Sequence, residues 1–578
     1  MMTGAGPDNK HPIPSATVSL SADHPAAAAA CQPPLWNAAE LAQATGGSWH
    51  DGEHGRNTSQ KSIAEGSKNI PGLPAIHNIQ IDSRACGPGS LFIAISGSRH
   101  DGHDFLASCK ENGASAALVS KYDAATGLPQ LVVADTHKAL KQLAATARAR
   151  TQARITTITG SVGKTGTRAM LEAVLRQAEQ DANRNKPQNL QPRAVHASSG
   201  NLNNHFGAPL SLARMPQETK HAVFELGMNK PNEIEPLARL CKAHIAIITR
   251  IAESHSGNFS TLEEIAFAKT EIFSGISHEN TPASENPRNR WGGMAIINAD
   301  DGFAEFAETR ARDQGATKII RFGRNDNADY QLVSCSTTTR ADNTQGLIAE
   351  VFTGGEPWRF SMACTAPHWA ENALAVIAAA DYLGIDRNSI ATALHDFHEP
   401  PGRGLTRRLS ISENIEITII DDSYNASPTS MRAALKTLSL SVIAQPAPGA
   451  KPDRANRRIA VLGDMMELGS IAEQAHRDLA SAVVEAGTDW LVLVGPLMEK
   501  LGQELESKCF SSEITIHRTA SAEAAAELLL PQLQQDDLVL IKGSNSIGMA
   551  KIIQLFDAAR KKTGASASLA GDGGTHAA

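Results

Sequence analysis

The stretch ITGSVGKTGT, which begins at Ile158, is a glycine-rich loop of the kind that binds phosphate. Backbone N–H groups reach phosphate oxygens only where side chains leave room, which favours glycine at Gly160 and Gly163. Lys164 would neutralise the charge of the β- and γ-phosphates, and the hydroxyl of Thr165 would ligate Mg²⁺. The common G-x-x-x-x-G-K-[ST] signature has a glycine where Ile158 stands, so a plain strand–helix turn is the alternative.

Three further side chains that could assist such a loop lie in or after apolar segments. Glu225 ends the run HAVFE, His255 follows AHIAIITRIAES, and Lys269 lies in EEIAFAKTEIF, which has apolar residues at helical spacing. A carboxylate at a strand end beside a phosphate loop can hold Mg²⁺, a cation that prefers oxygen ligands. Each residue taken singly also has a purely structural explanation: a solvated carboxylate, a hydrogen-bonded histidine, or a lysine whose aliphatic stem packs against apolar surface.

The elements that must position these residues alternate between strands and helices. RITTIT is a β-branched run before the glycine loop, and TRAMLEAVLRQAEQ after it repeats apolar residues at helical spacing. This is the strand–loop–helix order that a phosphate loop requires. HAVFELG, AHIAIITRIAE and MAIINADD continue the same unit, and IEITIIDDS, RRIAVLGD, DWLVLVG and DLVLIKGS form strands of another. The alternation predicts an α/β fold.

Length and composition set the expected number of domains. With 578 residues and about 150 residues per domain, we expect three or four. Termini rich in alanine, glycine and serine predict disordered extensions, and polar insertions are expected at 49–69, 181–194 and 277–293. The predicted organisation is a disordered extension at 1–34, a first domain at 35–150, a central domain at 151–400, a C-terminal domain at 401–562 and a disordered tail at 563–578.

Charge and residue content argue against several partners. A net charge of −7 without a basic run, together with 4% aromatic residues, disfavours nucleic acids and anionic lipid surfaces. The seven cysteines are scattered and never spaced as C-x-x-C, which favours a reducing compartment and buried, inert thiols over disulfides or zinc ligands. Without an apolar run of about 18 residues or a signal peptide, we expect a cytoplasmic protein that does not enter the membrane.

A series of motifs resembles one family. TGSVGKT, GNLNNHFGAPLSL, ELGMNKPNEI, ESHSGNF, AKTEI, INADD, DDSYNASPTSM, LGDMMELG and KGS follow one another as in the Mur ligases of peptidoglycan synthesis, from about Leu35 to about Ile553. The loop of that family has the shortened G-x-x-G-K-T form, which accounts for the missing outer glycine. The resemblance implies three α/β domains: a UDP-binding N-terminal domain, a central ATP-binding P-loop domain with a mainly parallel sheet, and a Rossmann-like C-terminal domain.

The resemblance also implies a reaction. The motifs are similar to those of Mur ligases that join D-alanyl-D-alanine to the tripeptide carboxylate of UDP-N-acetylmuramoyl-tripeptide through an acyl phosphate, as monomers, with ATP and two Mg²⁺ ions. The diaminopimelate- or lysine-adding Mur ligase is the alternative; it is disfavoured because no D-N-P-[RA] motif is present and Asn425 stands where that relative has histidine. A folylpolyglutamate synthetase-like ligase lacks the DSR…DGHDF block. A P-loop GTPase should carry the guanine-reading motif N-K-x-D, which is absent from this sequence. A non-enzymatic protein that binds the precursor would not need Lys164, Glu225, His255 and Lys269 together.

Functional positions of the family map onto this chain residue by residue. Lys269 corresponds to a lysine that is carbamylated in family members, which turns a cation into an anionic oxygen ligand for Mg²⁺. The block APHWAENALAV keeps His368 and Asn372 of the common G-R-H-N-x-x-N pattern but differs at Ala366 and Trp369, and KGSNSIGM lacks the arginine often found after K-G-S. The positions are Lys164, Lys269, His255 and Arg403 for catalysis; Gly160, Ser161, Val162, Gly163, Lys164, Thr165, Gly166, Asn298, Asp422 and Asn425 for the nucleotide; Thr165, Glu225, His255 and Lys269 for metal; and Ser83, Arg84, Gly97, Asp101, His103, Asn203 and Asn204 for substrate.

Overall fold

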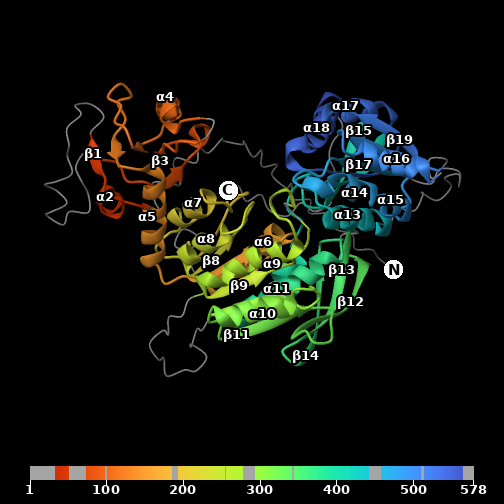
Figure 1. Ribbon diagram of the computed structural model, residues 1–578, viewed down its shortest axis with the longest axis horizontal. Helices are drawn as coiled ribbons and strands as arrows, with labels where there is room; N and C mark the ends of the chain where they lie inside the picture. The colour runs from red at the N-terminus through yellow and green to blue at the C-terminus, as the bar shows by residue number, and fades with distance from the viewer. Residues whose placement is uncertain are drawn as a thin grey trace, which may run out of the picture. The chain divides into compact units, whose positions relative to one another are not determined.

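The chain forms three α/β sheets, which the computed structural model shows in Figure 1. Two compact units divide it, one up to Thr136 and one from His137 onward. The predicted fold class is confirmed, since each sheet is mostly parallel and carries helices. The domain boundaries remain predictions. The structure describes residues 33–50, 73–97, 100–184, 193–253, 256–276, 293–341, 344–412, 414–441, 457–508 and 513–563, so nearly all of both predicted extensions lies outside the described residues.

The first unit is built on a sheet whose five described strands have the order β1-β5-β4-β3-β2. Strands β2 to β5 run parallel, and β1 joins β5 in the antiparallel direction. Fully buried residues of β3 and β4 pack against α4 to form the core. The elements are α2 (Ala38–Thr45), β1 (Ser48–His50), β2 (Asn78–Gln80), η1 (Ser83–Ala85), β3 (Ser90–Ile93), η2 (Gly102–Phe105), α4 (Leu106–Glu111), β4 (Ala116–Val119) and β5 (Gln130–Val132).

Two of the predicted polar insertions begin later than expected. The range expected for the first includes Trp49, but Trp49 lies in β1, is fully buried and donates its indole N–H to the carbonyl of Ala38 at 2.8 Å. The range expected for the second begins at Asp181, but α6 continues to Ala182, and Asp181 accepts a hydrogen bond of 2.7 Å from Ser389. Both residues adjoin polar stretches of the sequence, and the contacts that order them, with Leu131 for Trp49 and with Ser389 for Asp181, are distant in sequence. Residues 51–72, 185–192 and 277–292, which form the main parts of the three insertions, lie outside the described residues.

The central sheet has nine described strands in the order β14-β13-β12-β11-β10-β9-β6-β8-β7. From β7 to β12 all pairs are parallel. Helices α6, α11 and α12 cover one face, and α5, α7, α8, α9 and α10 cover the other. The elements are α5 (Thr136–Ala149), β6 (Arg154–Thr159), α6 (Lys164–Ala182), β7 (Val195–Ala197), α7 (Gly207–Ala213), β8 (His221–Glu225), α8 (Ile234–Cys241), β9 (Ile245–Ile248), η4 (Ser256–Asn258), α9 (Leu262–Thr270), η5 (Glu271–Gly275), β10 (Met294–Asn298), α10 (Ala304–Asp313), β11 (Lys318–Gly323), α11 (His368–Tyr382) and α12 (Arg387–His395).

An antiparallel extension of this sheet was not predicted from the sequence. It consists of β12 (Tyr330–Thr339), β13 (Gln345–Thr353) and β14 (Glu356–Met362). Gly354 and Gly355 join the last two strands with φ values of +59° and +91°, the left-handed conformation that a two-residue hairpin turn needs. Two adjacent glycines between two strand-like runs are a sequence signal that predicts such a hairpin.

The third sheet has six described strands in the order β15-β16-β20-β17-β18-β19 and is parallel except for β15. Helices α13 to α16 cover one face, and α17 and α18 the other. Helix α13 begins where Ser427 caps it and Pro428 occupies the first turn. The elements are β15 (Leu405–Ser412), β16 (Ile415–Asp422), α13 (Pro428–Leu440), β17 (Arg458–Gly463), η7 (Gly469–Ile471), α14 (Ala472–Arg477), α15 (Ala480–Glu485), β18 (Trp490–Val494), α16 (Glu499–Ser507), β19 (Thr515–Thr519), α17 (Ala522–Leu529), η9 (Leu530–Gln532), β20 (Leu538–Lys542), η10 (Asn545–Ile547) and α18 (Ala550–Thr563).

Cysteines and helices bear on two further expectations. Cys109, Cys241 and Cys364 are buried free thiols, whereas Cys86 and Cys335 are partly exposed, so the expectation that all the thiols are buried is wrong for these two. No helix within the described residues is long and apolar enough to cross a bilayer.

Candidate functional site

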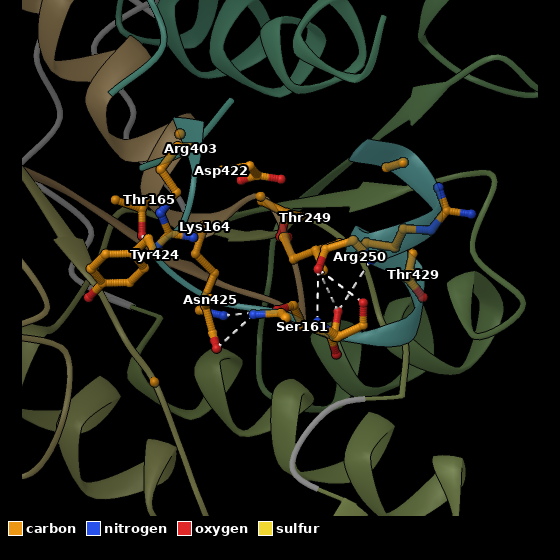
Figure 2. A pocket seen from close by; sticks show the side chains of 18 of the residues that line it. Ser161, Lys164, Thr165, Thr249, Arg250, Arg403, Asp422, Tyr424, Asn425 and Thr429 are labelled. Carbon is orange, nitrogen blue, oxygen red and sulfur yellow. Dashed lines mark hydrogen bonds between the residues drawn. The ribbon is translucent and has the colours of Figure 1, made fainter. Parts of the chain in front are cut away.

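The carboxyl ends of the central parallel strands meet at one edge of the sheet, and a cavity of about 630 Å³ lies there. Side chains from the central and third sheets line it, as Figure 2 shows. The structure therefore brings together most of the residues predicted for nucleotide, metal and catalysis. Those that line the cavity are Ser161, Val162, Gly163, Lys164, Thr165, Gly166, Asn203, Asn204, Glu225, Lys269, Asn298, Arg403, Asp422 and Asn425.

The glycine loop between β6 and α6 has the backbone that its sequence predicts. Gly160 and Gly163 have φ values of +147° and +85°, which side chains rarely adopt. A Cβ atom on Gly160 would lie 2.1 Å from Oγ1 of Thr249, and one on Gly163 would lie 2.9 Å from Oδ1 of Asn372. The Thr249 hydroxyl donates to the carbonyl of Val162 at 2.6 Å, so the end of β9 holds the loop in place.

Lys164 is folded back onto this loop. Its Nζ donates to the carbonyl oxygens of Gly160 at 2.6 Å and Ser161 at 3.2 Å. Burial lowers the pKa of Lys164; the carboxylate of Glu225 opposes this shift and the guanidinium of Arg403 adds to it. A bound polyphosphate would replace the carbonyl oxygens as the partner of the ammonium group and favour its charged form.

Glu225 is the centre of a hydrogen-bond network at the end of β8. It is 3% exposed, and its two carboxylate oxygens accept hydrogen bonds of 2.8 Å from the Thr165 hydroxyl and the Asn203 amide. The Ser198 hydroxyl accepts the backbone N–H of Glu225 at 3.0 Å. The hydroxyl and carboxylate oxygens are a donor set that suits Mg²⁺, so the residues present fit this ion.

Lys269 lies on α9 and is 1% exposed. Burial and then the positive charge of Lys164 lower its pKa well below the ordinary value, while Glu225 and Glu271 oppose the shift. A lysine in such a place favours the neutral amine. Close to the glycine loop, Lys164 and Arg403 line the same cavity as the carboxylate of Glu225, an arrangement that suits an anionic ligand.

Arg403 connects the segment before β15 to the glycine loop. Its Nη2 donates to Oγ1 of Thr165 at 3.1 Å, and its guanidinium lies 4.1 Å from the ring centroid of Tyr424. The ring orients the guanidinium by a cation–π contact. Figure 2 shows Arg403, Tyr424 and Thr165 close to one another. Arg403 can therefore reach a phosphate held by the loop.

Asp422 and Asn425, predicted for the nucleotide, are fixed by a buried lysine. Nζ of Lys542 lies 2.7 Å from Oδ2 of Asp422 and donates to the carbonyl of Asn425 at 2.8 Å. Lys542 is 2% exposed. Asn298, at the end of β10, uses its amide to hold the carbonyl of Thr249 at 2.9 Å. Asn298, Asp422 and Asn425 all line the cavity, and their contacts with a base or sugar remain predictions.

The predicted substrate residues lie in two places. Asn204 lines the cavity, and its Oδ1 accepts the backbone N–H groups of Phe206 and Gly207 at the start of α7, which is the capping explanation for an asparagine here. Asn203 binds Glu225. Contacts of both asparagines with a peptide remain predictions. Ser83, Arg84, Gly97, Asp101 and His103 all belong to the first unit.

In the first unit, Asp101 is the best-organised of these residues. It accepts hydrogen bonds from the Ser96 hydroxyl at 2.8 Å and from Nδ1 of His103 at 2.6 Å, and His103 holds its pKa at about 2. Nε2 of His103 accepts the backbone N–H of Ser120 at 3.0 Å, which places the ring proton on Nδ1. Arg84 is exposed and pairs with Asp82 at 2.7 Å, so its guanidinium is near the surface.

Not every predicted residue can be placed, and some lining residues were not predicted. His255 lies outside the described residues. Thr249, Tyr424 and Lys542 line the cavity but were not singled out from the sequence. Thr249 and Lys542 directly follow or end an apolar strand, the signal that identified Glu225. Tyr424 follows β16 by two residues and gave no separate signal.

Comparisons with known proteins agree with this arrangement. The family model described as Mur ligase middle domain matches residues 158–380, the one described as Mur ligase, glutamate ligase domain matches 407–545, and the one described as Mur ligase family, catalytic domain matches 75–148. The first two ranges contain most of the residues that line the cavity; Arg403, Gly404 and Ser546 lie outside them.

Individual relatives cover most of the chain. UDP-N-acetylmuramoyl-tripeptide–D-alanyl-D-alanine ligase of Rickettsia prowazekii is 31% identical, over 86% of this chain and 99% of that protein. The enzyme of the same name from Escherichia coli is 31% identical, over 82% of this chain and 92% of that protein. The crystal structure of MurF from Acinetobacter baumannii has a TM-score of 0.68 at 27% identity, over 90% of this chain and 99% of that one. The chain therefore belongs to the Mur ligase family and is of its MurF type.

Proposed function

We propose that this protein joins D-alanyl-D-alanine to the tripeptide carboxylate of UDP-N-acetylmuramoyl-tripeptide, with ATP, in peptidoglycan precursor synthesis. The observation that carries the proposal is the glycine-loop cavity, in which Lys164, Thr165, Glu225 and Lys269 converge. Relatives that bear the name of this reaction match nearly their whole length. We propose that the enzyme works as a monomer in the cytoplasm.

The reaction has two steps. An oxygen of the tripeptide carboxylate attacks the γ-phosphorus of ATP, ADP leaves, and an acyl phosphate forms. The neutral amine of D-alanyl-D-alanine then attacks the acyl carbon, the C–O bond to phosphate breaks so that inorganic phosphate leaves, the nitrogen releases one proton, and the amide forms. A carboxylate oxygen is a poor leaving group, so phosphorylation is what makes the amide bond possible. The role of the protein is to hold the reactants in line and to stabilise the charge on the transferring phosphoryl group.

Lys164 and Arg403 supply this stabilisation. Lys164 exchanges the loop carbonyl oxygens for phosphate oxygens, and Arg403, already oriented by Tyr424, reaches the same phosphates through its position beside Thr165. Backbone N–H groups of the glycine loop cradle the remaining oxygens. The walls of the cavity come from both sheets, so that bound reactants are shielded from water, which would hydrolyse the acyl phosphate.

Two Mg²⁺ ions are part of the proposal. Thr165 and Glu225 would hold one ion, and Lys269, as a carbamate, together with His255 would hold the other. Bound Mg²⁺ supplies Lewis-acid stabilisation of phosphate charge. The low pKa of Lys269 supports carbamylation, because only the neutral amine adds to CO₂, releasing one proton and leaving an anionic carbamate.

The first unit is proposed to bind the UDP portion. The exposed guanidinium of Arg84 offers donors to a diphosphate, and the carboxylate of Asp101, held by hydrogen bonds from Ser96 and His103, offers an acceptor to the rest of the nucleotide. Asn203 and Asn204 are proposed to contact the muramoyl peptide where it enters the cavity.

Phosphate release and product mass test this function. Purified protein with MgATP and UDP-N-acetylmuramoyl-tripeptide should release phosphate with D-alanyl-D-alanine and form the UDP-pentapeptide. Single amino acids, including diaminopimelate and lysine added to the dipeptide precursor, should give background rates. Turnover with a single amino acid, and none with the dipeptide, would refute the substrate assignment.

A further inference from the structure

Glu271 has a buried carboxylate that binds backbone amides distant in sequence. It is 3% exposed and begins η5, directly after α9. Its Oε1 accepts the N–H of Asn232 at 2.7 Å, and its Oε2 accepts those of Ile234 and Glu235, each at 3.0 Å. Three backbone donors thus converge on one carboxylate.

The amides that Glu271 binds belong to the end of the β8–α8 loop, residues 226–233, and to the first turn of α8. Glu233, the N-cap of α8, makes no side-chain cap hydrogen bond, so Glu271 satisfies N–H groups that a helix start leaves without partners. Asn232 has a φ of +65°, a left-handed conformation that asparagine tolerates better than most residues. The carboxylate therefore fixes both the helix start and the turn before it.

The β8–α8 loop connects Glu225 to the backbone amides that Glu271 binds, an arrangement that we call the Glu271 clamp. Glu225 ends β8 immediately before the loop, and Gly227, Met228 and Asn229 line the cavity. Within the loop, Glu233 accepts the N–H of Asn229 at 2.7 Å. The cavity wall is thus held at one end by the sheet and at the other by Glu271.

The segment that carries Glu271 is itself rigidly packed against α8. A Cβ atom on Gly275, at the end of η5, would lie 2.0 Å from the carbonyl oxygen of Ala238, so the two backbones approach as closely as glycine allows. The N–H of Ala243 donates to the carbonyl of Gly275 at 2.8 Å. Since Lys269 lies two residues before Glu271, movement of the clamp would move Lys269 relative to Glu225.

We propose that Glu271 is a positioning residue of the ATP site, which ties the cavity-lining β8–α8 loop to the end of α9 and so fixes the separation of Glu225 and Lys269. The inference rests on the proposed function for the roles of these two residues. Glu271 itself touches no reacting atom: its oxygens are occupied by backbone amides.

The Glu271→Gln variant tests the proposal with little change of shape. A glutamine presents one oxygen and one NH₂ group, so at least one of the three N–H groups would face another donor. Amide hydrogen exchange in residues 226–235 should accelerate by about 10-fold or more. The affinity for ADP with Mg²⁺ should fall by about 10-fold, while that for ADP with EDTA stays at the wild-type value, because the loss is in ion positioning.

Asp537→Asn is the matched control. Asp537 is 1% exposed, accepts the N–H of Gln534 at 2.8 Å and pairs with Arg457, but it directly precedes β20 of the third sheet and does not line the cavity. It should lower the melting temperature and leave the Mg²⁺ dependence of ADP affinity unchanged. Unchanged amide exchange in Glu271→Gln, an unchanged Mg²⁺ dependence, or an equal shift in Asp537→Asn would overturn the proposal. Ligation by the wild-type protein is measured separately, so failure of the proposed function is distinguishable from failure of this one.

Discussion

The Thr165 hydroxyl donates a 2.8 Å hydrogen bond to the carboxylate of Glu225, which lies 60 residues later in the chain. The bond joins the first turn of α6 to the end of β8 and places two oxygen donors at the floor of the cavity. Asn203 holds the other carboxylate oxygen at the same distance. Glu225 is buried, and hydrogen bonds hold both of its carboxylate oxygens. A cation that binds between Thr165 and Glu225, in place of the hydrogen bond that joins them, would therefore find both oxygen ligands already oriented.

Glu225→Gln should impair Mg²⁺ use more than folding. An amide carries no charge and is a poorer ligand for Mg²⁺, so kcat should fall by about 10²- to 10³-fold and the Mg²⁺ concentration for half-maximal rate should rise. Steady-state kinetics over a Mg²⁺ series measure both. Glu356→Gln, which changes an exposed carboxylate at the start of β14, serves as the control and should be unaffected. A Glu225→Gln enzyme with the wild-type Mg²⁺ response would rule out this ligand.

Gly160→Ala should abolish nucleotide binding. The new methyl group would lie 2.1 Å from the Thr249 hydroxyl, in a backbone conformation that alanine disfavours. Adding Thr249→Ala relieves only the contact, so the double variant should recover affinity partly. Gly354→Ala is the control, because its φ is +59° and nothing lies within 4 Å of a Cβ there. It should cost about 1 kcal/mol of stability and leave ATP affinity intact. Full ATP affinity in Gly160→Ala would contradict the proposed loop geometry.

Asp101→Asn should weaken binding of the UDP substrate without changing the chemical step. His103 and Ser96 donate to this carboxylate, and its loss would release the His103 ring. We expect KM for UDP-N-acetylmuramoyl-tripeptide to rise by about 10-fold, with kcat at saturation close to the wild-type value, since a residue with the proposed role in UDP binding would hold the ground state and the transition state equally. Michaelis curves at saturating ATP and dipeptide measure this. A change confined to kcat would place Asp101 elsewhere in the mechanism.

Glu399→Gln should remove a pH dependence of stability. Burial raises the pKa of Glu399 to about 7, and its carboxyl group accepts the N–H of Thr365 at 3.0 Å. The folded state therefore keeps a proton that the unfolded state loses near pH 4.5. Stability is fully present below about pH 4.5 and declines, by up to about 3 kcal/mol, as pH rises to about 7. Urea unfolding at pH 5 and pH 8 should show a flatter profile in the variant. An equal change in the free energy of unfolding between pH 5 and pH 8 in both proteins would contradict the raised pKa of Glu399.

The carboxyl-end rule for parallel strands explains what the sequence could predict. Thr165, Glu225 and Asn298 each lie at the end of an apolar strand or just after the following loop, so their convergence follows once the strands are recognised. Lys542 obeys the same rule, but a lysine at a strand end is usually solvated, and its buried pairing with Asp422 depends on the neighbouring strand β16.

Other features depend on contacts that no local pattern encodes. The clamp by Glu271 joins residues 36 to 39 positions apart, and its sequence neighbourhood resembles an ordinary helix end. Trp49 follows two glycines and a serine and precedes a polar stretch, yet it is buried because β1 pairs with β5, and Trp49 faces Leu131. In both cases tertiary pairing, rather than propensity, decides the outcome.

Lys164→Ala gives the most direct test of the central claim that the cavity grips the triphosphate of ATP to activate a peptide carboxylate. Phosphate release should be measured with saturating UDP-N-acetylmuramoyl-tripeptide and D-alanyl-D-alanine, with thermal melting as the check on folding. We expect a rate at least about 10³-fold below wild type in a protein that still melts cooperatively. A folded Lys164→Ala protein that couples ATP hydrolysis to amide formation at the wild-type rate would contradict this claim.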